Sequence, residues 1–273
     1  MSNLPDDFMF SQSSLQDYVD CPRRFELKYL LKQRWPALQV DDVLDFEERM
    51  SQGSYFHEVV HQHLVGIPAE ILQGRIQDEA VAGWFATYLQ TGLENVPERR
   101  YPEKTLTVPM GDYGLLAKID LLAIGEKIQI IDWKTSRRVP KQTWLAGRLQ
   151  TRVYRYVVVR GASHLHAGDI DPAQIEMVYW YADQNGETVR IPYSQEQYEA
   201  DEQFLTELIA EIDARAGFPL TEDESRCKFC TYRSLCDRGQ QAGSLAEWDA
   251  GDIDEVDIDD FEIDIDQIAE IAF

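Results

Sequence analysis

Two neighbouring apolar segments in the middle of the chain each carry a carboxylate. Residues 113–124 and 128–134 are rich in Ile and Leu, as is typical of strands that are buried on both faces. Asp120 lies in the first segment and Asp132 in the second. Because a buried carboxylate must be paired with a cation or bind a metal, the chain must fold so that both acids find such a partner.

The link between the two segments decides whether these acids can meet. Side chains alternate between the faces of a sheet with period two. A two-residue turn would leave Asp120 and Asp132 on opposite faces, whereas a three-residue loop over residues 125–127 pairs them and puts Lys134 on the same face. We predict the three-residue loop, with one of its residues near the left-handed conformation.

Two carboxylates and a lysine on adjacent strands are the groups that metal-dependent cleavage of a phosphodiester needs. The carboxylates hold a hard divalent cation, and the lysine positions or polarises the attacking water. Gln150 and Tyr154 follow, four residues apart on one face of an expected helix. The alternative, a hairpin with polar residues on its solvent face, leaves the apolar neighbours unexplained.

The segment after Asp132 is basic in an otherwise acidic chain. Residues 133–168 hold eight Lys or Arg and no acid, while the whole chain has a formal charge of −23. A polyanion lying beside the metal would account for this reversal. Three arginines repeat at i, i+4 and i+7, so they can follow a phosphate backbone while Tyr154 stacks on a base. The residues predicted to bind the polyanion are Arg137, Arg138, Lys141, Arg148, Arg152 and Arg155.

The acidity is concentrated at the end of the chain. Residues 239–273 hold twelve acids and no Lys or Arg, which leaves 37 acidic against 26 basic residues elsewhere. The net charge therefore does not exclude a nucleic acid. No stretch of about 18 apolar residues could span a membrane, and the N-terminus has no signal peptide pattern, so we expect a cytoplasmic protein without a membrane partner.

His57-Glu58-x-x-His61 has two functional interpretations. It matches the zinc metalloprotease pattern, with two imidazoles one helical turn apart and a glutamate base. The extended form of that pattern fails, so a third ligand would come from Glu70 or Glu79. In the other interpretation His57 alone is a metal ligand beside the two carboxylates. The structural alternative is a helix with half-buried histidines.

Four cysteines form a split set. Cys227, Cys230 and Cys236 make a compact three-ligand loop, and Cys21 is the one remaining candidate for a fourth ligand. Cysteines at this spacing in a reducing compartment favour metal over disulfides. A shared metal would clip the two ends of the chain together. Zinc and an iron–sulfur cluster both remain open.

Periodicity and turn residues predict an α/β order. Helices are expected at about residues 11–21, 22–31, 45–65, 71–93, 141–159 and 194–216. Strands are expected at about residues 105–110, 113–124, 128–134, 175–182 and 187–192, the last two joined by a turn at Asn185-Gly186. Residues 1–240 would form one domain. Residues 241–273 would form an acidic tail that is solvated, covers the basic segment or docks a partner.

Taken in order, these residues resemble the signatures of RecB-type nucleases in the PD-(D/E)XK superfamily. The resemblance runs from about residue 11 to residue 236. It is closest to the CRISPR-associated iron–sulfur exonucleases and the nuclease domains of bacterial helicase–nucleases. It rests on Ser13-Ser14-Leu15-x-x-Tyr18, Cys21-Pro22-Arg-Arg-Phe25, Gly53-x3-His57, Asp120, Ile131-Asp132-Trp133-Lys134-Thr135, Gln150-x3-Tyr154 and the C-terminal cysteines.

The resemblance implies a restriction-endonuclease-like core, with a central mixed sheet flanked by helices, and a role for each residue. Lys134 would orient the water and stabilise the transition state, and Gln150 and Tyr154 would hold the DNA strand and the lysine. The ligands of Mg²⁺ or Mn²⁺ would be His57, Asp120, Asp132 and the backbone carbonyl of Trp133. A structural 4Fe-4S cluster would bind to Cys21, Cys227, Cys230 and Cys236. The chain departs from the family in carrying Asp132 where Glu is commoner and Trp133 where Tyr is frequent.

The function implied is metal-dependent hydrolysis of DNA, as a single-strand exonuclease in recombination, repair or CRISPR adaptation. A helicase, an integrase or a single-strand-binding protein would be its partner. One alternative is a non-catalytic, DNA-binding nuclease-fold subunit of a larger complex. The other is the zinc metalloprotease of His57 and His61.

Overall fold

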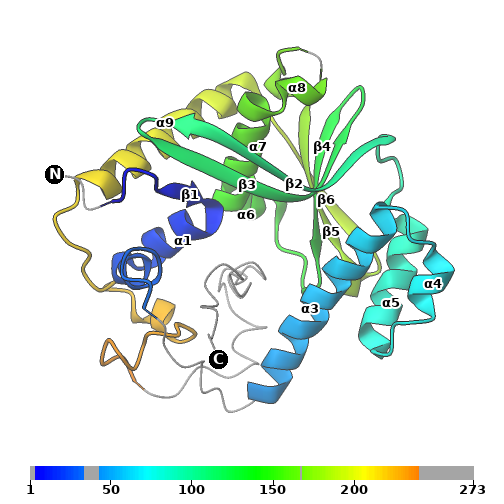
Figure 1. Ribbon diagram of the computed structural model, residues 1–273, viewed down its shortest axis with the longest axis horizontal. Coiled ribbons are helices and arrows are strands. Elements are labelled where there is room, and N and C mark those ends of the chain that lie inside the picture. Colours follow the sequence, from blue (N-terminus) through cyan, green and yellow to red (C-terminus); the bar gives the residue numbers. More distant parts are fainter. Residues whose placement is uncertain (1–3, 34–42, 167, 240–273) are drawn as a thin grey trace, which may run out of the picture.

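The computed structural model describes residues 4–33, 43–166 and 168–239. In this part of the chain six strands form one sheet with helices on both faces (Figure 1). The strands are β1 Met9–Ser11, β2 Arg99–Met110, β3 Tyr113–Ile124, β4 Ile128–Lys134, β5 Ile175–Tyr181 and β6 Glu187–Pro192. The α-helices are α1 Gln12–Asp20, α2 Pro22–Phe25, α3 Val43–Leu64, α4 Ala69–Gln73, α5 Glu79–Thr87, α6 Gln142–Gly147, α7 Leu149–Gly161, α8 Ser163–His166 and α9 Gln195–Ala214.

The sheet is mixed, as expected. Its order is β1-β3-β4-β5-β6, and β2 pairs with β3 as well. β1 with β3 and β4 with β5 are parallel, whereas the other pairs are antiparallel. β2 runs along the whole of β3. β1 and β4 therefore share the other edge of β3, β1 at its beginning and β4 at its end.

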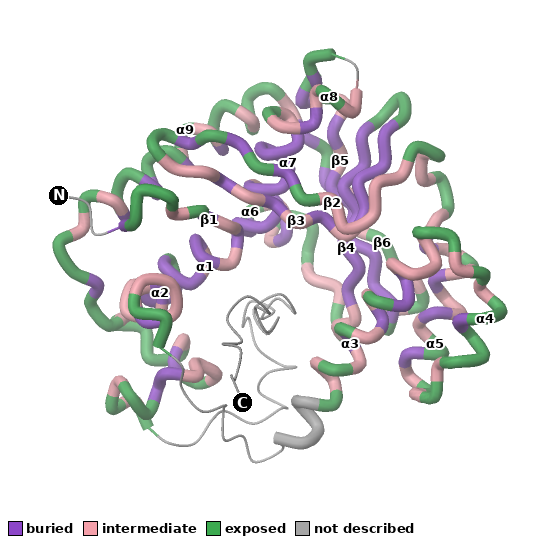
Figure 2. Tube along the Cα trace, viewed as in Figure 1, coloured by how far each residue is buried: buried purple, intermediate pink, exposed green. Residues whose placement is uncertain are grey.

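Each face of the sheet packs against its own hydrophobic core. Ile130 and Tyr179 join a core with α1, α7 and α9, which we call the α7 side. Their neighbours Ile131 and Trp180 join a second core with α3 and α5, the α3 side. Strands β4 and β5 are therefore buried along almost their whole length (Figure 2), which explains their lack of apolar and polar alternation in sequence.

The predicted loop between β3 and β4 is confirmed. Ile124 pairs with Ile128, so three residues, 125–127, connect the strands. The predicted left-handed residue is wrong, because none of the three has a positive φ. Instead the N–H of Gly125 donates a hydrogen bond to the carbonyl of Lys127, 3.0 Å away, which closes the loop locally.

Two expected helices are each broken in the structure. The stretch at 71–93 divides into α4, α5 and a π-helical turn Tyr88–Gly92, because Asp78 caps a new N-terminus by accepting from the N–H of Val81. The stretch at 141–159 divides into α6 and α7 at Arg148, whose ψ of 146° is extended. The preceding Gly147, a weak helix former, is the only sequence signal of that break.

β1 was not predicted and β2 begins at Arg99 rather than at about residue 105, whereas several other elements follow their sequence signals. Ser11 caps α1 in a capping box with Ser14, and Ser194 caps α9. Asn185 and Gly186 have φ of 53° and 78°, as a tight hairpin turn requires. The expected tail, residues 241–273, lies outside the described residues. In the described segments no helix has the length and apolarity needed to cross a bilayer.

Candidate active site

The hydrogen-bonded pairing of β3 with β4 ends one residue before Asp120 and Asp132. Leu121 and Ile131 form its last backbone pair, so Asp120 and Asp132 come next on their strands and lie level with each other. On this edge of β3, β1 pairs only with residues 114–116. No described strand therefore fills the edge between β1 and β4, and the backbone next to Asp120 is open to other groups.

The β2–β3 ribbon is distorted at Asp120. Ile119 belongs to the α7-side core and Leu121 to the α3-side core, although strict alternation would put both on one face. The register places Glu103 of β2 opposite Asp120, and Glu103 has a left-handed φ of 47°, which costs free energy for a non-glycine residue. The Asp120 side chain reaches β4, where Oδ2 accepts from the N–H of Trp133 at 2.9 Å.

His57 approaches the same point from α3. Its Nε2 donates to the carbonyl oxygen of Trp133 at 2.8 Å, and its Nδ1 lies 3.5 Å from Oδ2 of Asp120. Since a carbonyl oxygen only accepts, Nε2 carries a proton in this arrangement. Burial acts to raise the pKa of Asp120, but His57, the Trp133 N–H and Lys134 outweigh it, so this pKa lies below its usual value.

Asp132 and Lys134 lie on the α7 side of β4. Lys134 Nζ is 3.0 Å from Oδ2 of Asp132. From α7, Gln150 Nε2 donates to Oδ1 of the same carboxylate at 2.8 Å. Both oxygens of a carboxylate that is only 6% exposed are therefore oriented by protein groups, and the buried acid is compensated as its surroundings require.

The candidate metal ligands are carried by α3, β3 and β4, with Asp120 and His57 in contact at the backbone of Trp133. Two carboxylates, one main-chain carbonyl and one imidazole make a donor set of hard oxygens and a nitrogen, which suits Mg²⁺ or Mn²⁺. Asp120 remains 16% exposed, so the site is open to solvent on one side. Within the described residues, no three His, Cys, Asp or Glu side chains are close enough together to hold one metal ion. His57 would have to leave the Trp133 carbonyl and lose its Nε2 proton in order to ligate through that atom.

The structure corrects the expected roles of the α7 pair. Gln150 is buried and its amide is bonded to Asp132 and Tyr179. Tyr154 is buried in the α7-side core, so the prediction that its ring stacks on a base is wrong. The spacing of four residues correctly placed both on one face of a helix, but that face is buried and is directed toward the protein rather than toward a substrate.

Two residues that the sequence did not single out lie at the site. Tyr179 is the cross-strand partner of Asp132 in the parallel β4–β5 pair, and Lys134 Nζ lies 5.9 Å from its ring centre. Glu103 is close enough that, after burial, Asp120 is the main cause of its raised pKa. Glu103 also pairs with Lys118 at 3.4 Å. Neither could be found by local spacing, because each meets the site through strand register.

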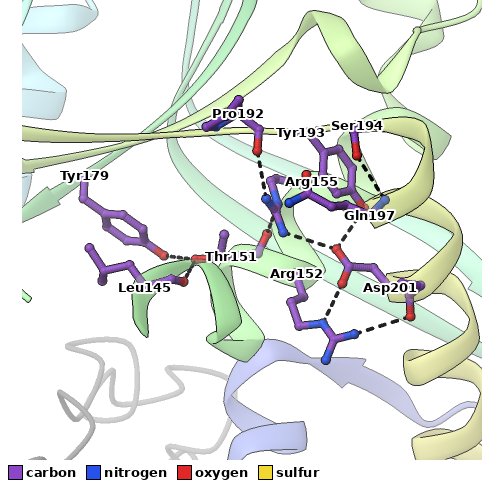
Figure 3. A network of polar contacts seen from close by, with 11 residues as sticks. Leu145, Thr151, Arg152, Arg155, Tyr179, Pro192, Tyr193, Ser194, Gln197 and Asp201 are labelled. Atoms are coloured by element: carbon purple, nitrogen blue, oxygen red, sulfur yellow. Dashed lines mark hydrogen bonds and ion pairs between the residues drawn. The ribbon is translucent and has the colours of Figure 1, made fainter. Parts of the chain in front are cut away.

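Two of the arginines predicted to bind the polyanion are structural (Figure 3). Arg155 is 2% exposed and bonds to Asp201 of α9 and to main-chain oxygens. Arg152 donates to the other oxygen of Asp201 at 2.6 Å and lies over the Phe204 ring. The prediction is wrong for Arg155, which no substrate can reach, and the charge of Arg152 is already paired. A repeat at helical spacing fits a buried face as well as a surface one.

The other basic residues differ in their accessibility. Arg137, Arg138 and Lys141 are exposed on the segment that directly follows Lys134. This segment is tied to the 3₁₀ turn after β5, since Gln184 donates to the carbonyl of Arg137 at 2.8 Å. Arg148 is buried and packs against Trp144. Of the six residues predicted to bind the polyanion, Arg137, Arg138 and Lys141 are therefore best placed beside the candidate site.

The four cysteines lie on the N-terminal and C-terminal segments that adjoin one another, but among the described residues no three of them are close enough to hold one metal ion. All are free thiols. Burial raises the pKa of Cys230 to about 11 and also raises those of Cys227 and Cys236. In the latter two, Cys21 is the next cause after burial. The predicted set thus lies within electrostatic range of one another, although nearly the whole chain separates its members.

Ion pairs join the same two segments. Asp20 at the end of α1 binds Arg24 of α2 at 2.6 Å and Arg226 of the cysteine-bearing segment at 3.2 Å. Tyr232 donates to the carbonyl of Gln33 at 3.0 Å. The cysteine-bearing segment consequently lies beside α1 and α2 (Figure 1).

The metalloprotease interpretation receives no support from the geometry. His57 is directed at Trp133 and Asp120, as described above. Glu58 is exposed and accepts a hydrogen bond from Gln62. Glu58, the base in that interpretation, and His57, its first zinc ligand, therefore do not face a common site.

Three comparisons with known proteins bear on the family of this chain. A search of curated protein sequences returned no match. Among solved structures, the chain is similar to a candidate exonuclease from Eubacterium rectale (TM-score 0.48, 11% identity, 76% of this chain and 80% of that one). It is also similar to the protein SSO0001 (TM-score 0.40, 14% identity, 85% of this chain and 87% of that one). The model of the PD-(D/E)XK nuclease superfamily matches residues 9–237, and the chain therefore belongs to that superfamily.

Proposed function

We propose that this protein is a metal-dependent deoxyribonuclease that hydrolyses phosphodiester bonds of single-stranded DNA as an exonuclease. The observations that carry the proposal are two sets of contacts on either side of Trp133: Asp120 accepts from the Trp133 N–H and lies beside His57, and Lys134 lies 3.0 Å from Asp132. Membership of a nuclease superfamily makes a nucleic acid the substrate. Recombination, repair or CRISPR adaptation is the proposed setting, with a helicase, an integrase or a single-strand-binding protein as partner.

The cation would be held by Asp120, Asp132, His57 and the carbonyl of Trp133. When bound, Mg²⁺ or Mn²⁺ supplies Lewis acidity at a phosphate oxygen and makes water a nucleophile near neutral pH. Asp120 is ready for this role, because its lowered pKa keeps it ionised. To ligate through Nε2, His57 would have to carry its ring proton on Nδ1 instead.

Lys134 would act on the reacting phosphate. Its ammonium group is held 3.0 Å from Oδ2 of Asp132, the carboxylate that would also ligate the cation. A positive charge fixed there stabilises the negative charge that develops on the phosphate oxygens in the transition state. Gln150 would keep Asp132 in place from the opposite side.

The strand would approach along the exposed segment after β4. Arg137, Arg138 and Lys141 supply positive charge within a few residues of Lys134. Contacts of this kind neutralise phosphates without reading sequence. Binding through them should weaken steeply as salt is raised.

The cysteines would hold a structural 4Fe-4S cluster, with zinc as the alternative. Grouped thiols repel one another once ionised, and burial adds to that cost, so a cationic centre would relieve both effects. Metal bound to Cys21 and the C-terminal cysteines would add to the Asp20 ion pairs that already join the two segments. Anaerobically purified protein should be brown and absorb broadly near about 400 nm; colourless protein containing stoichiometric zinc would refute the cluster.

The function is tested by cleavage of end-labelled single- and double-stranded DNA by anaerobically purified protein. Lys134→Ala should lower the rate by about 100-fold or more without loss of DNA binding, and circular dichroism checks that the variant, which leaves the buried Asp132 without this counter-charge, is folded. Lys127→Ala is the matched control, since this exposed lysine lies in the loop at the far end of β4. Reactions run with Mn²⁺, Mg²⁺ or a chelator test the need for metal.

The outcomes separate the candidate functions. Degradation that requires metal and Lys134 but not Lys127 supports the nuclease, and the product ladder reports its direction. DNA binding without turnover in any metal would overturn it in favour of a non-catalytic subunit. Cleavage of protein rather than DNA, lost in Glu58→Ala, would restore the metalloprotease.

A further inference from the structure

The β2–β3 ribbon changes face on both of its strands at the level of Asp120. In β3, Ile119 and Leu122 both belong to the α7-side core, although they are three positions apart. In β2, Tyr101 and Leu106 both pack on this core, although they are five positions apart. Residues an odd number of positions apart lie on opposite faces of a regular strand. Each strand therefore loses one step of its alternation.

An inserted residue does not cause this change of face. Pro102 pairs with Leu121 on one side of it, and Lys104 pairs with Ile119 on the other. One residue of each strand lies between these two pairs, so the strands have equal numbers of residues here. A β-bulge would place two residues of one strand opposite one residue of the other. The change of face therefore comes from the backbone conformation within the ribbon.

Glu103 has the backbone conformation that interrupts the alternation. It follows Pro102 in β2 and lies opposite Asp120, and its φ of 47° is left-handed. Within the described residues it is the one non-glycine strand residue with a positive φ. Strand residues have φ of about −120 to −140°, so the chain turns sharply at Glu103. Because proline followed by a residue with positive φ is the order found in type II turns, Pro102 favours this turn.

The side chain of Glu103 does not explain why its backbone is strained. Its carboxylate pairs with Lys118 at 3.4 Å, where the two side chains are 29% and 36% exposed. An ion pair this exposed contributes little to stability, whereas a left-handed φ costs free energy for a residue that has a Cβ. Strained residues of this kind occur at functional sites, where the surrounding structure holds them. The functional neighbour of Glu103 is Asp120.

We infer that Glu103 is a positioning residue, and that its left-handed backbone directs the side chain of Asp120 toward β4. This inference rests on the proposed function, which makes Asp120 a functional carboxylate. In a regular strand the side chain stands roughly perpendicular to the sheet, whereas the backbone N–H groups point along the sheet toward the neighbouring strand. Asp120 accepts from the N–H of Trp133 at 2.9 Å, so its side chain lies along the sheet rather than on one face.

The direction of Asp120 decides two contacts of the candidate site. Its Oδ2 accepts from Trp133 and lies 3.5 Å from Nδ1 of His57. A β2–β3 ribbon that kept its alternation would carry this carboxylate to one face of the sheet. Both contacts would then be lost together.

The test compares substitutions of Glu103 that change the backbone preference with substitutions that change only the side chain. Valine is β-branched, so it strongly disfavours a positive φ and fits a regular strand. Glu103→Val should therefore straighten β2 and withdraw Asp120 from Trp133. Glycine accepts a positive φ without cost, and glutamine keeps the size of the side chain without its charge. Glu103→Gly and Glu103→Gln should therefore leave Asp120 in place.

The first readout is hydrogen exchange of the Trp133 N–H, measured by NMR on the full-length protein without metal or DNA. Glu103→Val should speed exchange of this amide by about 10-fold or more, because the amide loses a charged acceptor, while the other β4 amides keep their wild-type rates. Thr105→Val is the matched control, since Thr105 is an exposed residue of the same strand without a positive φ. Thr105→Val, Glu103→Gly and Glu103→Gln should exchange as the wild type does.

The second readout is cleavage of single-stranded DNA. Displacement of a reacting group by about 1 Å can lower a rate by about 100-fold. Glu103→Val should therefore lower kcat by about 10- to 100-fold with little change in KM. Glu103→Gly should keep a kcat near that of the wild type, although it has no side chain at this position.

Two results would overturn the inference. One is unchanged exchange of the Trp133 N–H in Glu103→Val. The other is equally fast exchange in Glu103→Val, Glu103→Gly and Glu103→Gln, which would assign the effect to the carboxylate of Glu103. Should Glu103→Val not fold, Glu103→Ala and Glu103→Gly decide. Both lack the side chain but only glycine accepts the left-handed φ without cost, so exchange should be faster in Glu103→Ala, and equal rates would overturn the inference.

The inference and the proposed function can fail separately. Wild-type protein that cleaves DNA, with Trp133 exchange unchanged in Glu103→Val, overturns the inference alone. Wild-type protein that cleaves no DNA with any metal, with Trp133 exchange faster in Glu103→Val, overturns the proposed function and leaves Glu103 as the residue that directs Asp120. Faster exchange and a lower kcat in Glu103→Val alone are the results we expect.

Discussion

Replacing Asp201 by alanine should destabilise this protein strongly, although Asp201 lies on a peripheral helix. Its carboxylate is 6% exposed and Arg155 beside it 2%. One oxygen accepts from Arg152 at 2.6 Å, and the other accepts from Arg155 at 3.4 Å and Tyr193 at 2.9 Å (Figure 3). The substitution leaves the buried guanidinium of Arg155 with main-chain carbonyls but no counter-charge.

The magnitude follows from that burial. Burial lowers the pKa of Arg155 and Asp201 is the main opposing influence, so the charge depends on this carboxylate. Removing one partner of a buried pair costs about 3–5 kcal/mol. That loss is a large part of the roughly 5–15 kcal/mol that stabilises a folded domain.

Urea unfolding followed by circular dichroism measures the loss. Glu202→Ala is the control at the next position, where the carboxylate is 41% exposed, pairs with Arg160 at 3.7 Å and accepts from the Tyr156 hydroxyl at 3.1 Å. Loss of the exposed ion pair costs about 0–1 kcal/mol and loss of the hydrogen bond about 0.5–1.5 kcal/mol, which is less than the loss expected at Asp201. The urea dependence of the unfolding free energy should stay the same in both variants.

Equal midpoints for Asp201→Ala and Glu202→Ala would refute the reasoning. A second arm tests the physical cause. The double variant Arg155→Met, Asp201→Leu removes both buried charges and should recover much of the lost stability, because apolar groups can replace a buried ion pair at little cost. If the double variant is as unstable as Asp201→Ala, the loss comes from packing rather than from the unpaired charge.

Two further perturbations test other parts of the structure. Burial acts to raise the pKa of Asp17, but Arg24 at 2.5 Å and Lys28 at 3.0 Å outweigh it and lower this pKa. The stability that this lowered pKa contributes is present above the ordinary carboxyl pKa and is lost as pH falls through the lowered pKa of Asp17. The urea midpoint of Asp17→Asn should therefore change less than that of the wild type below about pH 4. Equal pH dependence of the two midpoints would contradict this. Gly186→Ala should cost about 1–3 kcal/mol in unfolding free energy, since φ is +78° and the new Cβ would lie 2.3 Å from Thr91 Oγ1; an unchanged thermal midpoint would contradict it.

The spacing of residues along the chain was sufficient to predict the arrangement of β3 and β4 at the candidate site. The alternation of side chains in two apolar segments predicted a three-residue loop, which the register confirms; the ladder ends at Leu121 and Ile131, one residue short of the predicted pair of Asp120 and Asp132. The same period placed Lys134 with Asp132. These features could be predicted because a hairpin is a local structure, and its register depends on the length of one short loop.

The spacing of residues in the sequence did not predict where the helices break or whether a basic side chain is buried or exposed. A basic repeat at helical spacing describes Arg148, Arg152 and Arg155 equally well on a surface or in a core. The decision came from Asp201, which lies more than forty residues further along the chain. The break at Arg148 likewise has one weak local signal, Gly147.

The sequence by itself determined the identities of the metal-binding and catalytic candidates, the loop that aligns them and the superfamily resemblance. All of these depend on residue type and on spacing over short distances. Only the tertiary structure decided that Tyr179 stands behind Gln150, that Glu103 lies opposite Asp120, and that His57 reaches the carbonyl of Trp133. Those contacts join elements far apart in the chain, and packing of the two cores against one sheet brings them together.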